Sequence, residues 1–274
     1  MVSPANTNPS LTQGPNWAKG QRQRQANSYF RVATTDVNQG RFAARFARED
    51  LKLDRVAVVH DKKVYGQGLS SIFADDFRKS GGTIVATETV NPGDKDFSAV
   101  ISKLQPRSPQ MVYYGGEYPE SSLLSNQMKA KGLRVPLMGG DGMFDPTYIK
   151  NAGKASEGDY ATSVGAPAAS LPSAKAFISA YDAAGYREPY SAYGPQSYDS
   201  AKAILEALPG KDRIDDSVRR EVVSAMGGVS FQGATGRVAF DEYGDNVTKI
   251  LTVYRVRDGR WTTVKTGTFW APPP

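Results

Sequence analysis

RVAVVH, at residues 55–60, decides the fold class of this 274-residue chain. The run is short and almost wholly apolar, without the polar alternation of a strand that is half exposed. Such a run is typical of a strand buried on both faces, as in the middle of a parallel sheet. A helical pattern follows at residues 68–80, with one apolar stripe, and Gly81-Gly82 ends it. The segment therefore predicts one strand-helix unit of an α/β protein.

The same alternation extends from residue 28 to residue 164. A helix is expected after Asp36, which is placed as an N-cap, and another after Asp96, with Phe97, Val100, Ile101 and Leu104 on its inner face. Because strands and helices alternate at short spacing, the sequence predicts a doubly wound parallel sheet. The other expected strands are 28–32, 83–90, 110–114, 135–138 and 159–164, and the other expected helices are 120–131 and 146–151.

After residue 167 the pattern changes to longer helices and then to alternating strands. Strand patterns at residues 236–240 and 249–256 precede Asp258-Gly259, a strong hairpin signal before residues 261–264. The C-terminal part is therefore expected to supply an antiparallel edge. The helices expected before it are 172–184, 193–208 and 215–226.

Composition excludes several classes of function. The chain has no cysteine and one histidine, His60, so disulfides and thiolate or multi-histidine metal sites are excluded, and no cofactor is predicted. The net charge is +6, but the only local basic cluster is KGQRQR at residues 19–24, which does not favour nucleic-acid binding. No apolar run approaches the roughly eighteen residues of a membrane span, and the first residues lack the pattern of a secretion signal.

Three polar, glycine-containing loops directly follow predicted strands: residues 61–68, 113–119 and 139–142. Because ligands of open parallel sheets bind beyond the carboxyl ends of the strands, these loops are the candidate site. Tyr65 is expected at the crest of the first loop, and Asp141 stands between glycines in the third. Tyr65 as an exposed aromatic, and Asp141 as a turn residue that bonds its own backbone, remain alternative interpretations.

The second loop, YYGGEYP, offers the charge of Glu117 and the ring of Tyr118. A solvated turn is the alternative. Paired carboxylates of Glu117 and Asp141 would also be compatible with a hydrolase, although no nucleophile, metal set or cofactor motif accompanies them.

The order and spacing of four motifs resemble the periplasmic leucine/isoleucine/valine-binding proteins, the solute receptors of branched-chain amino acid ABC transporters. The motifs are DKKVYGQG (61–68), GDKDFSAVISKL (93–104), VYYGGEYPE (112–120) and PLMGGDG (136–142). The opening VSPANTNPSLT also resembles a segment of the family's first-lobe site. The resemblance is dense to about residue 165 and weaker to about residue 265.

The resemblance implies the two-lobed type I periplasmic-binding-protein fold, with a hinge that closes the lobes on the ligand. One lobe is expected to contain residues 1–35 and 167–246, and the other residues 36–166 and 247–266, with 267–274 as a tail. The family's first strands have no counterpart in the chain, so lobe 1 is expected to be incomplete. We therefore expect weak or no ligand binding by this chain alone, and self-association through an exposed lobe 1 edge.

The resemblance also implies roles for individual residues. Ala5 and Thr7 would bind the ligand carboxylate, Tyr65 would line the pocket, and Asp141 would pair with the ligand ammonium group. An aromatic residue near the later hinge falls on Tyr193.

Glu117 stands where the family commonly has tyrosine, with Tyr118 beside it. This departure leaves open a more polar or cationic ligand.

The implied function is that of a non-enzymatic amino-acid receptor, periplasmic or otherwise extracytoplasmic, with a membrane permease as its partner. A complete protein of this kind is expected to be a monomer. A hydrolase using Glu117 and Asp141, and a ligand-sensing domain for amides or aromatic acids, are the alternatives.

Overall fold

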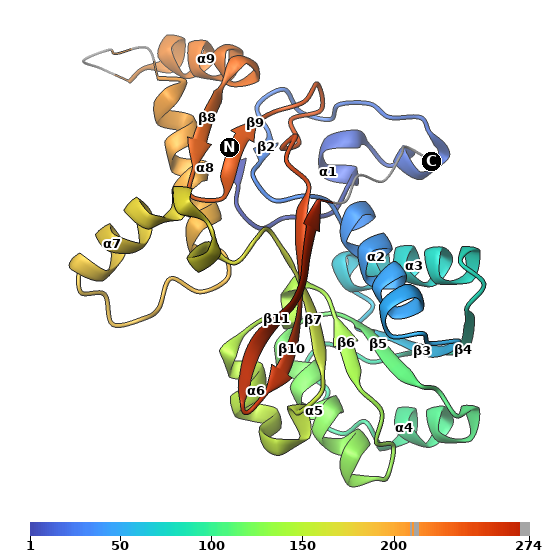
Figure 1. Ribbon diagram of the computed structural model, residues 1–274. Helices are drawn as coiled ribbons and strands as arrows, with labels where there is room; N and C mark the ends of the chain where they lie inside the picture. The colour runs from blue at the N-terminus through green and yellow to red at the C-terminus, as the bar shows by residue number, and fades with distance from the viewer. Residues whose placement is uncertain (209, 211–213, 269–274) are drawn as a thin grey trace. The chain divides into compact units, whose positions relative to one another are not determined.

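The computed structural model describes residues 1–208, 210 and 214–268, which form two compact units (Figure 1). Unit 1 consists of Met1–Thr35 and Gly165–Ile250. Unit 2 consists of Asp36–Val164 and the described residues from Leu251 onward. Both units are therefore built from separate stretches of the chain.

Unit 2 contains a sheet that has seven strands within the described part of the chain, in the order β11-β10-β7-β6-β5-β3-β4. The five strands from β4 to β7 pair in parallel, and β10 runs antiparallel to β7. The predictions of a parallel sheet and of an antiparallel C-terminal edge are therefore confirmed. The strands are β3 (Arg55–His60), β4 (Thr83–Thr89), β5 (Met111–Gly115), β6 (Leu137–Gly139), β7 (Tyr160–Val164), β10 (Ile250–Arg257) and β11 (Arg260–Thr268).

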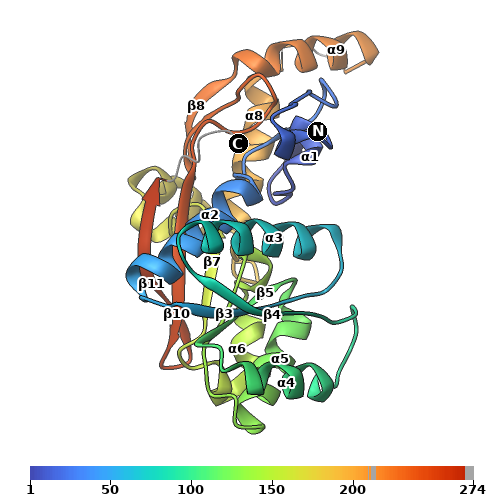
Figure 2. The same ribbon diagram turned by 90° about the vertical axis from the view of Figure 1, so that its right-hand side faces the viewer.

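Helices cover both faces of this sheet, as Figure 2 shows. On one face Phe73 of α3 stacks on Tyr113 of β5, with ring centroids 3.7 Å apart. Tyr114, the next residue, packs in the core of the other face. Both faces of β5 are thus buried, which explains its unbroken apolar pattern. The helices are α2 (Asp36–Arg45) and α3 (Val64–Lys79) on the first face, and α4 (Ser98–Leu104), α5 (Tyr118–Ala130) and α6 (Pro146–Ala152) on the second.

Helix α3 begins four residues earlier than expected, so Tyr65 lies in its first turn rather than at a loop crest. Gly66 allows this start because the helix crosses the end of β5 at very short range. A Cβ atom on Gly66 would lie 2.4 Å from the carbonyl oxygen of Gly115 and 2.2 Å from Oδ1 of Asp61. Gly68, one half-turn later, has no neighbour within 4 Å of such an atom.

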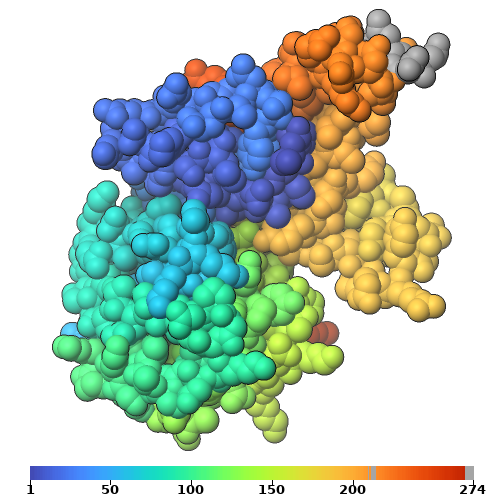
Figure 3. Space-filling model, turned by 180° about the vertical axis from the view of Figure 1, so that it is seen from behind, coloured from blue at the N-terminus to red at the C-terminus, as the bar shows by residue number. Residues whose placement is uncertain are grey.

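Unit 1 is built around a short parallel pair, β1 and β2, and an antiparallel hairpin, β8 and β9. Apolar side chains of β2 and β9, including Phe30 and Val238, form its core with α8 and the residues that follow α9. The N-terminal residues (dark blue in Figure 3) lie against α8. The elements are β1 (Val2–Ser3), α1 (Ser10–Gln13), β2 (Phe30–Arg31), α7 (Lys175–Ala183), α8 (Gly194–Glu206), α9 (Asp216–Ala225), β8 (Ser230–Gly233) and β9 (Gly236–Ala239).

Several boundaries differ from the predictions. β1 and β8 were not predicted, and the two residues of β1 are too few to give a periodic signal. Residues 267–268, predicted as part of a tail, are the last residues of β11, and residues 269–274 of that tail lie outside the described residues. In the part of the chain that the structure describes, the helices are too short or too polar to cross a membrane.

The crossing of α3 and β5 predicts opposite effects of one substitution at two positions. Gly66→Ala should lower the free energy of unfolding by about 1–3 kcal/mol, because the new methyl group meets backbone atoms that cannot move aside. Gly68→Ala should raise it by about 0.5–1 kcal/mol, because alanine favours helix and the space is open. Urea unfolding of both variants measures the difference, and equal effects would contradict the close crossing.

Candidate functional site

Two of the predicted site residues, Tyr65 and Asp141, are in direct contact within unit 2. Tyr65 follows β3 and Asp141 follows β6, so both stand beyond the carboxyl ends of parallel strands. The Tyr65 hydroxyl donates to Oδ1 of Asp141 at 2.7 Å and accepts from the Gly142 N–H at 3.1 Å. The Asp141 side chain is almost fully buried. The contact joins the first turn of α3 to the turn after β6.

The glycines around Asp141 make this contact possible. A Cβ atom on Gly140 would lie 2.6 Å from the Tyr65 hydroxyl oxygen and 2.4 Å from a methyl carbon of Leu69. A Cβ atom on Gly142 would lie 3.1 Å from the Tyr65 ring. The GGDG pattern therefore serves a close approach between a turn and an aromatic ring.

Gln39 of α2 also contacts Asp141, and the sequence analysis missed it. Its Nε2 donates to Oδ1 of Asp141 at 2.8 Å, and its Oε1 accepts from the Asp141 backbone N–H at 3.0 Å. Gln39 is fully buried. The available sequence signal, a glutamine three residues after Asp36, suggests a helix-capping role rather than a site.

Glu117 and Tyr118 mark the start of α5. Lys63 Nζ lies 3.0 Å from Oε2 of Glu117, and both side chains are about half exposed, at 42% and 50%. The hydrogen bond that Lys63 donates to the Glu117 carboxylate raises the pKa of Lys63. Tyr118 packs against the core on the α4–α6 face, which is the sheet face opposite to α3. These two residues therefore belong to surroundings different from those of the Tyr65–Asp141 contact.

In unit 1 the predicted residues Ala5 and Thr7 lie in the turn after β1. Ser3 Oγ accepts from the N–H groups of Ala5 and Asn6, at 3.4 and 3.0 Å. Thr7 is buried. Arg31 Nη1 donates to the carbonyl oxygens of residues 6 and 8, at 3.0 and 2.8 Å, and so holds the backbone on both sides of Thr7.

Arg31 itself is held by a buried ion pair with Asp245. Arg31 Nε lies 2.5 Å from Oδ1 of Asp245, and both side chains are at most 1% exposed. Gln13 donates to the other carboxylate oxygen at 2.7 Å. Burial raises the pKa of Asp245, but the Arg31 charge and these hydrogen bonds outweigh it, so the pKa lies below its ordinary value. The pair therefore connects the N-terminal turn to the chain that returns after β9.

Tyr193, the remaining predicted residue, directly precedes α8 and belongs to unit 1. His60 ends β3, and its Nδ1 accepts from the Lys62 N–H at 3.1 Å. Burial lowers the pKa of His60. Across the described residues, histidine and acidic side chains form no group of three that could hold a metal ion.

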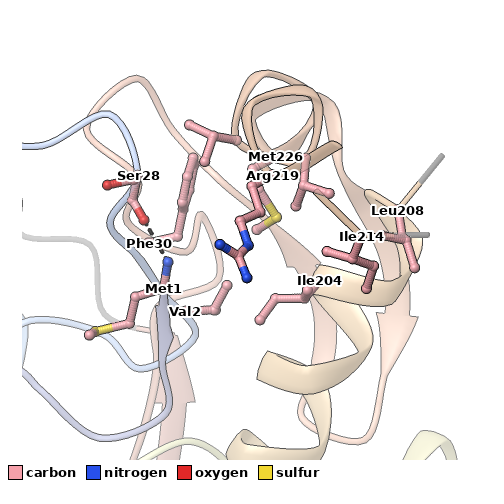
Figure 4. Close-up of a pocket in the computed structure, with 11 residues that line it drawn as sticks. Met1, Val2, Ser28, Phe30, Ile204, Leu208, Ile214, Arg219 and Met226 are labelled. Atoms are coloured by element: carbon pink, nitrogen blue, oxygen red, sulfur yellow. Dashed lines mark hydrogen bonds between the residues drawn. The ribbon is translucent and has the colours of Figure 1, made fainter. Parts of the chain in front are cut away.

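A separate hollow of about 260 Å³ lies in unit 1 (Figure 4). Its walls are mostly apolar side chains from β1, β2, α8, α9 and the residues beside them, and among the described residues that line it Arg219 has the one charged side chain. None of the predicted site residues lines it. An apolar hollow of this kind does not match the two charges of a free amino acid.

Comparison with known proteins was decisive for the family. A family profile described as "Periplasmic binding protein" matches residues 5–260. The chain belongs to the periplasmic binding protein family. This family consists of solute-binding receptors that work outside the cytoplasm, rather than of enzymes.

Named relatives agree with this assignment. The leucine-, isoleucine-, valine-, threonine-, and alanine-binding protein of Pseudomonas aeruginosa is 33% identical over 268 residues, which are 97% of this chain and 67% of that protein. The chain therefore spans about two thirds of the length of that relative.

Solved structures give the same fold. A leucine binding protein from Thermotoga maritima matches with a TM-score of 0.83 and 31% identity, over 97% of this chain and 72% of that one. The branched-chain amino acid transporter substrate binding protein of Streptococcus pneumoniae, in complex with isoleucine, matches with a TM-score of 0.81 and 26% identity, again over 97% and 72%. The predicted type I periplasmic-binding-protein fold is confirmed.

The buried ion pair of unit 1 gives a prediction with an internal control. Asp245→Asn should lower the free energy of unfolding by about 3–5 kcal/mol, because it leaves the Arg31 charge buried without a partner. Asp216→Asn also removes an aspartate that is paired with an arginine, but both side chains of that pair are exposed, so the change should stay within about 0.5–1 kcal/mol. Thermal and urea unfolding measure both.

The same pair predicts a pH dependence. Because the folded pKa of Asp245 is depressed, its contribution to stability is present above the unfolded value of 3.8 and is lost as the pH falls below it. Asp245→Asn should therefore flatten the stability curve below about pH 4. An unchanged slope in that range would contradict the ion pair.

Proposed function

We propose that this periplasmic binding protein is a receptor for a free branched-chain α-amino acid. This proposal rests mainly on the contact of half-buried Tyr65 with the buried Asp141 at the ends of β3 and β6. A carboxylate with little solvent around it binds an ammonium group more strongly than an exposed one does. Branched-chain amino acids appear in the names of the relatives that match over nearly the whole chain.

The proposal gives the predicted site residues separate roles in binding. Asp141 receives the ligand ammonium group, and Tyr65 fixes Asp141 and lines the site. The turn of Ala5 and Thr7 receives the ligand carboxylate through N–H and hydroxyl groups, since Ser3 and Arg31 already hold its backbone. Tyr193 lines the ligand side chain, whereas Tyr118 packs against the core on the α4–α6 face and is not part of the proposed site.

The ion pair of Glu117 with Lys63 supports an apolar rather than a cationic ligand side chain. At 3.0 Å from the ammonium group of Lys63, the Glu117 carboxylate already has a counter-charge. A ligand lysine or arginine would have to compete with Lys63 for it. This argument favours leucine, isoleucine or valine as the ligand.

The proposed partner is the membrane permease of an ABC importer, which receives the ligand outside the cytoplasm. The solved relative from Streptococcus pneumoniae is a transporter substrate binding protein. A hydrolase that pairs Glu117 with Asp141 is not favoured, because each carboxylate has its own basic or hydrogen-bonding partner and the relatives are binding proteins.

Ligand-induced stabilisation tests the proposal. Leucine at ten times its Kd should raise the free energy of unfolding by about 1.4 kcal/mol. Asp141→Asn should abolish that increase, and Asp75→Asn, an exposed aspartate of α3, should leave it intact. Stabilisation is read at concentrations up to the millimolar range, so that weak binding is also detected. An unchanged response of Asp141→Asn, or turnover of any substrate, would refute the receptor proposal.

A separate experiment tests which ligand side chain the protein prefers. Leucine should bind at least several-fold more tightly than lysine. Lys63→Met, which removes the counter-charge of Glu117, should shift the ratio several-fold toward lysine, in line with the modest energy of an exposed ion pair. Calorimetric titration gives the dissociation constants for leucine and for lysine. Tighter binding of lysine by the unmodified protein would show that Glu117 selects a cation.

A further inference from the structure

The side-chain amide of Gln39 binds Asp141 at two places, the carboxylate and the backbone N–H. Its amide nitrogen donates to the carboxylate at 2.8 Å, while its amide oxygen accepts from the Asp141 backbone N–H at 3.0 Å. A side chain that binds both the backbone and the carboxylate of one residue fixes the torsion angle between them. The carboxylate therefore has a set direction before any ligand arrives.

The orientation of the Gln39 amide is determined by its surroundings. Its oxygen accepts a second hydrogen bond from the Thr162 hydroxyl of β7, at 2.9 Å. Its nitrogen faces two carboxylates, Asp141 and, at 3.4 Å, Asp36. A reversed amide would set its oxygen against both carboxylates and its nitrogen against a backbone N–H, so the opposite orientation is excluded.

These hydrogen bonds are buried, so the loss of any one of them is costly. Gln39 and Thr162 are fully buried, and Asp36 and Asp141 are at most 4% exposed. In such surroundings a lost hydrogen bond is not replaced by water, and a buried carboxylate that loses a donor turns toward another or is destabilised. Gln39 thus links α2, β7 and the turn after β6 at the proposed ammonium site.

We propose that Gln39 is a positioning residue that sets the Asp141 carboxylate for the ligand ammonium group. The inference rests on the proposed function, because it takes Asp141 as the group that binds the ammonium. Gln39 acts through Asp141, so its removal should weaken only ligands that carry an ammonium group.

Two ligands test this role. Leucine and 4-methylpentanoate share an isobutyl side chain and a carboxylate, but only leucine has the ammonium group. Gln39→Met should weaken the binding of leucine about tenfold or more, the loss expected for one hydrogen bond to a charged group, and should change the affinity for 4-methylpentanoate less than about threefold.

A matched control separates positioning from stability. Gln127 in α5 also makes two hydrogen bonds, to the N–H of Phe97 and the carbonyl of Lys95, at 2.8 and 2.7 Å. Gln127→Met should lower the melting temperature without changing the ratio of leucine to 4-methylpentanoate affinity. If Gln39→Met does not fold, Thr162→Val removes one hydrogen bond to the Gln39 oxygen and should weaken leucine about threefold.

The outcomes distinguish the inference from the proposed function. In one outcome Asp141→Asn loses leucine binding, but Gln39→Met (or Thr162→Val in its place) keeps a leucine Kd within about twofold of that of the unmodified protein. The positioning role is then wrong, and the receptor proposal is unaffected. If Asp141→Asn binds leucine normally, or the unmodified protein does not bind it, the proposed function fails and the role of Gln39 fails with it. Equal losses for both ligands would reduce Gln39 to a structural residue.

Discussion

The contact between the Tyr65 hydroxyl and the Asp141 carboxylate is the constraint around which unit 2 is arranged. It requires α3 to begin close to the sheet, and that start is compatible only with glycine where the helix crosses β5. It also requires glycine before Asp141, since a methyl group on residue 140 would overlap the Tyr65 hydroxyl, and it leaves little space for a side chain at residue 142. The glycines of the three loops thus allow α3 to lie close to β5 and Tyr65 to reach Asp141.

Unit 1 uses a buried charge to organise its own turn. Arg31 is neutralised by Asp245, donates from Nη1 to the carbonyl oxygens on either side of Thr7, and donates from Nη2 to the Thr12 hydroxyl. A fully buried guanidinium group is costly unless it is paired and fully hydrogen-bonded, so the turn and the ion pair depend on each other. In both units, the polar groups that we propose bind the ligand are held in place by buried residues that are distant in the sequence.

The sequence predicted the parallel sheet well because its central strands are buried on both faces. Residues 56–59 and 111–114 are all apolar, and the glycines and charges between strands mark the helix ends. The Asp-Gly hairpin was also predicted correctly, because both residues adopt positive φ angles, 52° and 68°, that few other pairs tolerate. Tyr65 and Asp141 were found because they follow strands whose ends meet in a parallel sheet.

Other features had no local signal. Arg31 and Asp245 are 214 positions apart, and nothing near either residue indicates that it is buried. Gln39 looks like an ordinary polar residue of a helix start until α2 is packed against the turn after β6. The early start of α3 was missed because glycine disfavours helices, and the reason for tolerating it lies in β5.

A structure of the protein with leucine bound tests the central claim most directly. The account predicts that the leucine ammonium nitrogen lies about 2.7–2.9 Å from a carboxylate oxygen of Asp141, while the Tyr65 hydroxyl still contacts that side chain. Leucine bound with its ammonium group directed to any other acidic residue, and with Asp141 still enclosed by Tyr65 and Gln39, would contradict it.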